Sequence, residues 1–78
     1  MALITGFSPK QRENYKTHDS ISADYYLLKR EGKVHLIQID AKGSNDREKP
    51  NKLSQTIQLD RKSGKELYTI LKEAFGFD

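Results

Sequence analysis

The segment SGKELYTILKEAFGF (residues 63–77) places its apolar residues at helical spacing. The apolar side chains form one stripe, made of Leu67, Ile70, Leu71, Ala74 and Phe75. Ser63, followed three residues later by Glu66, matches a capping box, and Asp60 is a competing cap one turn earlier. Gly76 is well placed to end the helix in a left-handed conformation. We therefore predict an amphipathic C-terminal helix over residues 61–76.

Upstream of this helix, two segments rich in β-branched and aromatic residues predict a hairpin. They are SISADYYLLKR (20–30) and VHLIQID (34–40), and Glu31-Gly32 supplies a turn between them. A two-residue loop fixes the register of the strands. The predicted pairs include Arg30 with Lys33, Leu28 with His35, Leu27 with Leu36, and Tyr25 with Gln38.

Neither face of the predicted hairpin is cleanly polar. One face carries Tyr26, Leu28, His35, Ile37 and Ile39, and the other carries Tyr25, Leu27, Lys29, Val34, Leu36 and Gln38. An antiparallel pair with water on one side should alternate apolar and polar residues. We therefore expect the second face to be covered by the N-terminal segment, by a second subunit or by a ligand.

The remaining segments complete a single domain over residues 1–78. Residues 53–59 predict a third strand, because their apolar and polar residues alternate. Residues 41–52 form a long polar loop with Gly, Asn and Pro, while residues 1–19 are an arm or a short element. The expected fold class is α+β: a three- to four-stranded antiparallel sheet, within residues 20–60, packed by one C-terminal amphipathic helix.

The composition limits the size of the core and the choice of partners. The chain has 78 residues, 35% hydrophobic and 32% charged, and it has no cysteine, so neither a disulfide nor a cysteine zinc site can stabilise it. A homodimer is therefore a reasonable expectation. The net charge of +3 is compatible with nucleic acid. No apolar run approaches the roughly 20 residues that span a membrane, so we expect a cytoplasmic protein without a membrane partner.

The sequence contains no recognisable catalytic constellation. It has no glycine-rich phosphate loop and no HExxH motif, and the chain is too short to enclose a typical active-site cleft. His18 and His35 lie far apart in the sequence, which argues against a shared metal ion. We predict no enzyme activity, no cofactor and no metal site.

Tyr25 is the most suggestive residue for function. In the predicted register it shares a face with Lys29 and Gln38, and aromatic rings stack on unpaired bases while basic side chains neutralise phosphates. Alternatively, Tyr25 packs against Leu27 and Leu36 under another subunit. Basic residues of the turn and the long loop extend the candidate site, namely Lys33, Lys42, Arg47, Lys49 and Lys52.

The order of elements resembles a known layout. A strand, a glycine turn, a strand, a long polar loop and a strand ending in Ile57-Gln58-Leu59-Asp60 precede the helix with Leu67, Ile70 and Leu71. This order is similar to the positive cofactor four and Pur-alpha families. The resemblance implies a curved sheet that binds single-stranded DNA or RNA, and a dimer.

Two functions therefore remain open at this point. The first is a small nucleic-acid-binding module, with single strands favoured, that uses the sheet face and the basic loop. The alternative is a protein-interaction module or small regulator that acts through an apolar sheet face.

Overall fold

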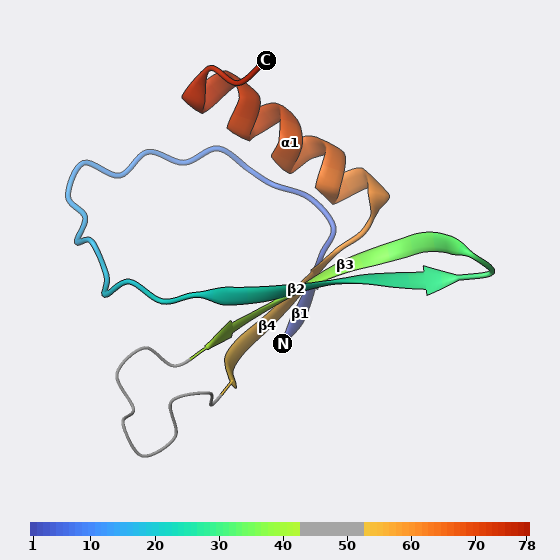
Figure 1. Cartoon of the computed structure of the whole chain (residues 1–78). Helices are drawn as coiled ribbons and strands as arrows, with labels where there is room; N and C mark the ends of the chain where they lie inside the picture. Colours follow the sequence, from blue (N-terminus) through green and yellow to red (C-terminus); the bar gives the residue numbers. More distant parts are fainter. Residues whose placement is uncertain (43–52) are drawn as a thin grey trace.

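The computed structural model describes residues 1–42 and 53–78, which form an α+β fold with a four-stranded sheet and a C-terminal helix (Figure 1). The elements are β1 (Ala2–Ile4), β2 (Ala23–Arg30), β3 (Lys33–Lys42), β4 (Leu53–Leu59) and α1 (Arg61–Phe75). The predicted fold class is confirmed, and the fourth strand comes from the N-terminal segment.

The strands lie in the order β1-β4-β3-β2. The β2–β3 and β3–β4 pairs are antiparallel, as expected, whereas β1 runs parallel to β4, with Ala2 opposite Ile57 and Ile4 opposite Leu59. The sheet is therefore mixed. The parallel pair is possible because residues 5–22 form a long connection, which runs past the helix before it enters β2 (Figure 1).

The hairpin turn forms where it was predicted, but the register beyond it differs. Glu31 and Gly32 both have positive φ, 53° and 80°, which is typical of a type I′ turn. Arg30 lies opposite Lys33 as predicted, but an irregularity in the pairing follows between Leu28 and Lys29. The remaining pairs, as observed, include Leu28 with Leu36, Leu27 with Ile37, Tyr26 with Gln38 and Tyr25 with Ile39.

This slip of one residue makes the predicted division of faces wrong. A bulge adds one residue to one strand, and every side chain of that strand beyond it changes its cross-strand partner and face relative to the other strand. As a result, Ile37 and Ile39 join Tyr25 and Leu27, while Gln38 joins Tyr26.

The two faces of the sheet now differ clearly in character. The apolar face, as strand pairing and alternation define it, carries Ile4, Tyr25, Leu27, Ile37, Ile39, Ile57 and Leu59. The polar face carries Leu3, Asp24, Tyr26, Gln38, Asp40, Thr56 and Gln58. On the polar face, side chains bond to one another across the strands: Thr56 Oγ1 donates to Asp40 Oδ1 at 3.1 Å, and Gln58 Nε2 donates to Gln38 Oε1 at 2.9 Å.

The helix begins at Asp60, so the competing cap is the correct one and Ser63 is not the N-cap. Asp60 Oδ1 accepts a hydrogen bond from Ser63 N at 2.8 Å, and Asp60 N donates to Ser63 Oγ at 3.0 Å. These reciprocal bonds form a capping box in which Ser63 occupies the third helical position. At the other end, Gly76 has φ 74° and its N–H donates to Lys72 O, as the sequence predicted.

The core that these elements enclose is small. Among the residues described, Leu59 is the buried apolar side chain, with 5% of its surface exposed, and Ser63 is fully buried beside it in the sequence order of the helix start. The helix contacts β3 and β4, but its C-terminal end lies well away from the sheet (Figure 1). Much apolar surface of the helix and of β2 is therefore left uncovered.

Candidate nucleic-acid interface

The edge strand β2 presents an uncovered aromatic side chain. Tyr25 is 73% exposed and Leu27 is 51% exposed, although both belong to the apolar face. They remain exposed because α1 packs on the neighbouring strands β3 and β4. A tyrosine ring held on a regular strand is a rigid flat surface, which is the property that base stacking needs.

Basic side chains gather at the tip of the same hairpin. Lys29, Arg30 and Lys33 are exposed, and Glu31 is the acidic residue among them. Within residues 1–42 and 53–78, the structure gives none of these three cations an ion pair. Lys29 follows Tyr25 by four residues on one face of β2, which corresponds to about 13 Å along the strand. The hairpin therefore brings together an exposed ring and a net positive tip.

Two of the predicted site residues do not join this group. Gln38 lies on the polar face, where its Nε2 donates to Asp40 Oδ1 at 3.0 Å and its Oε1 accepts from Gln58. Its amide is thus already engaged. Lys42 Nζ lies 3.4 Å from Asp24 Oδ2, so a carboxylate offsets its charge.

The loop part of the predicted site falls outside the described residues. This part consists of Arg47, Lys49 and Lys52. The described part of the candidate site is therefore the hairpin with Tyr25, Lys29 and Lys33, to which Arg30 is added.

Two further cations were missed in the sequence. Arg61 and Lys62 are exposed in the first turn of α1, and Arg61 lines a hollow of about 210 Å³ between the helix start and β3. Val34 and His35, next to the hairpin tip, line the same hollow. The sequence signal was their position directly after β4, since β4 and β3 are neighbours and the first turn of the helix must lie near the hairpin.

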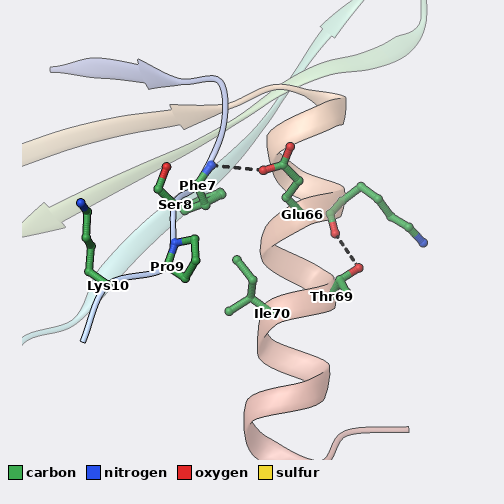
Figure 2. A pocket seen from close by; sticks show the side chains of 8 residues that line it. Phe7, Ser8, Pro9, Lys10, Glu66, Thr69 and Ile70 are labelled. Atoms are coloured by element: carbon green, nitrogen blue, oxygen red, sulfur yellow. Dashed lines mark hydrogen bonds between the residues drawn. The ribbon is translucent and has the colours of Figure 1, made fainter. Parts of the chain in front are cut away.

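A second concave region lies between α1 and the segment after β1. Phe7, Ser8, Pro9 and Lys10 face Glu66, Thr69 and Ile70 across it, as Figure 2 shows, and its volume is about 730 Å³. We call it the helix groove. Phe7 N donates to Glu66 Oε2 at 3.1 Å, which holds the segment beside the helix (Figure 2). The groove combines apolar side chains with few polar ones and lies far from the hairpin tip in sequence.

Two searches of the described residues gave no feature of another class. No group of three or more His, Cys, Asp or Glu side chains is arranged to hold a metal ion in residues 1–42 and 53–78. The described helix is neither long enough nor apolar enough to cross a membrane.

The fold and the hairpin define a small α+β domain with a mixed four-stranded sheet, an exposed tyrosine and a basic tip. No protein-family model, curated protein or solved structure matches the chain. The resemblance to the positive cofactor four and Pur-alpha families therefore stays a prediction, and function must be argued from the geometry alone.

Proposed function

We propose that this protein is a small nucleic-acid-binding module that recognises single strands through the β2–β3 hairpin. The observation that supports the proposal best is the exposure of Tyr25 on the same strand as the unpaired cation Lys29. A base stacks on the ring while the cations at the tip neutralise adjacent phosphates.

The charge distribution supports the hairpin rather than the polar face as the binding surface. Asp24 and Asp40 lie on the polar face, where Lys42 is the cation that an ion pair already engages. The tip carries three cations against Glu31 alone, and Arg61 adds a further positive charge on the helix side. A polyanion is therefore attracted to the hairpin and repelled by the polar face.

Single strands are favoured over duplex because of the ring. In a duplex the flat faces of the bases are stacked on each other, so an aromatic side chain reaches them only after unstacking. Unpaired bases offer their faces at no such cost, and stacking is tolerant of base identity. We therefore expect weak sequence preference.

A protein-interaction module acting through the sheet is the second candidate. It is favoured by the exposed Leu27 next to Tyr25, since an apolar side chain contributes to a protein interface but little to phosphate binding. In that case the hairpin side chains pack under a protein partner, and oligonucleotides do not compete with it.

The test is a fluorescence-anisotropy titration of labelled single-stranded oligonucleotides at several salt concentrations. Tyr25→Ala should weaken binding by about 1–3 kcal/mol, the usual contribution of one stacked base. Lys33→Gln should lower affinity less and reduce the salt slope by about one.

Tyr15→Ala is the matched control, because Tyr15 is 80% exposed but lies in the connection between β1 and β2. It should bind like the wild type. Absence of binding at low salt, or an equal loss in the two tyrosine variants, would refute the hairpin site. Equal affinity for duplex would refute the preference for single strands.

A further inference from the structure

The described chain leaves far more surface exposed than a completed fold of its size. A monomeric protein of 9.0 kDa is expected to expose about 4,850 Å², whereas this chain exposes 7332 Å². The radius of gyration is 14.9 Å, against about 11.5 Å expected for a compact domain of 78 residues. Some of the surface that should be buried is therefore missing a partner.

The uncovered surface is concentrated on α1. The side chains involved are Tyr68, Ile70, Leu71, Phe75 and Phe77, all of them exposed, and we call them the α1 apolar surface. Phe75 is 70% exposed, and its ring stacks on Phe77 with the centroids 5.6 Å apart. The apolar stripe was predicted to pack on the sheet, but the helix turns away from the sheet and leaves its second half uncovered (Figure 1).

From these observations we infer that the α1 apolar surface is the contact between two copies of this chain, related by a two-fold axis. The excess surface is about 2,500 Å² per chain, and obligate homodimers bury roughly 1,000–2,500 Å² on each subunit. The amount of uncovered surface thus suits a second subunit of the same kind.

The charges beside this surface also favour a second copy. Lys65, Glu66, Lys72 and Glu73 alternate in sign along the helix, and their charges cancel. A self-contact through this helix therefore brings no excess of like charge together, although the whole chain carries +3. A strongly acidic or basic partner would find no complementary field here.

The helix groove completes the contact. Ile70 belongs both to the α1 apolar surface and to the wall of the groove, opposite Phe7 and Pro9 (Figure 2). In a two-fold contact each subunit presents the same groove and the same aromatic side chains, so each groove of about 730 Å³ can receive apolar side chains of the other subunit. This contact lies on the helix, away from the hairpin tip, and it does not depend on nucleic-acid binding.

Sedimentation of the full chain over a wide range of concentrations tests the inference. The wild type should sediment with twice the mass of the 9.0 kDa chain, and the dimer should dissociate on dilution. Phe75→Lys should raise the dimer dissociation constant at least tenfold, because it places a charge in the apolar contact. A lysine in the last turn suits the helix dipole, so circular dichroism should show that the helix is retained.

Tyr15→Lys is the control, since it makes the same kind of change at an exposed aromatic residue outside α1. It should remain dimeric. A wild type that stays monomeric, an unchanged dimer in Phe75→Lys, or an equal loss in both variants would overturn the inference. So would a monomer that pellets with lipid vesicles through the same helix, because the occupant would then be a membrane surface. An oligonucleotide titration of Phe75→Lys reports separately on the hairpin.

Discussion

Replacing Ser63 with alanine should destabilise the domain measurably, although the change removes a single oxygen atom. Ser63 is fully buried, and its Oγ accepts from Asp60 N at 3.0 Å and donates to Asp60 Oδ1 at 2.9 Å. Alanine leaves the Asp60 N–H without its partner at the start of the helix. Losing a buried hydrogen bond of this kind costs about 1–2 kcal/mol. In a domain of this length each kcal/mol lowers the melting temperature by about 4–8 °C.

The assay is thermal unfolding followed by far-UV circular dichroism. Ser20→Ala is the matched control, because Ser20 is exposed ahead of β2, and it should melt like the wild type. The double variant Ser63→Ala/Asp60→Ala should lose less stability than the two single variants together, since both remove the same reciprocal bonds. A wild-type melting temperature in Ser63→Ala, or strict additivity in the double variant, would refute the role given to the capping box.

Two further predictions concern the turn and the pH dependence of stability. Glu31→Asn should stabilise the hairpin by about 0.4–1 kcal/mol, because asparagine tolerates the positive φ of a type I′ turn better than glutamate, whereas Gly32→Ala should destabilise it; chemical denaturation compares the two, and opposite signs would contradict the turn type. The hydrogen bond from Ser63 N, followed by that from Ser63 Oγ, lowers the pKa of Asp60 below its ordinary 3.8. The stability that this carboxylate contributes is therefore complete above pH 3.8 and is lost as the pH falls through the lowered pKa. The melting temperatures of the wild type and Asp60→Asn should converge at acid pH, and a constant difference would argue against the ionised cap.

The sequence predicted well those elements that local patterns determine. The strands around Glu31-Gly32 need only a turn and β-forming residues, and the helix needs only its stripe and Gly76. Strand β1 has just three residues, and its identity as a strand depends on β4, more than 50 positions away in the chain. No local pattern distinguishes such a strand from an arm.

The errors in the candidate site have one physical cause. The pairing irregularity between Leu28 and Lys29 shifts β3 by one residue, which separates Gln38 from Tyr25. A bulge of this kind reflects how both strands fit the rest of the sheet, so a two-residue turn cannot reveal it. Tyr25 and Lys29 stay together because they lie on the same strand, where alternation alone sets their face.

The parallel pairing of β1 with β4 also affects how the sheet is protected. Without β1, strand β4 would be an outer strand with open backbone N–H and C=O groups, which invite pairing with another molecule. Because a contact between distant segments carries a large loop-closure cost, β1 should dock late and detach easily. A bulky fusion at Met1, which is fully exposed beside β1, therefore risks unsealing the sheet and promoting aggregation, and an affinity tag is better placed after Asp78.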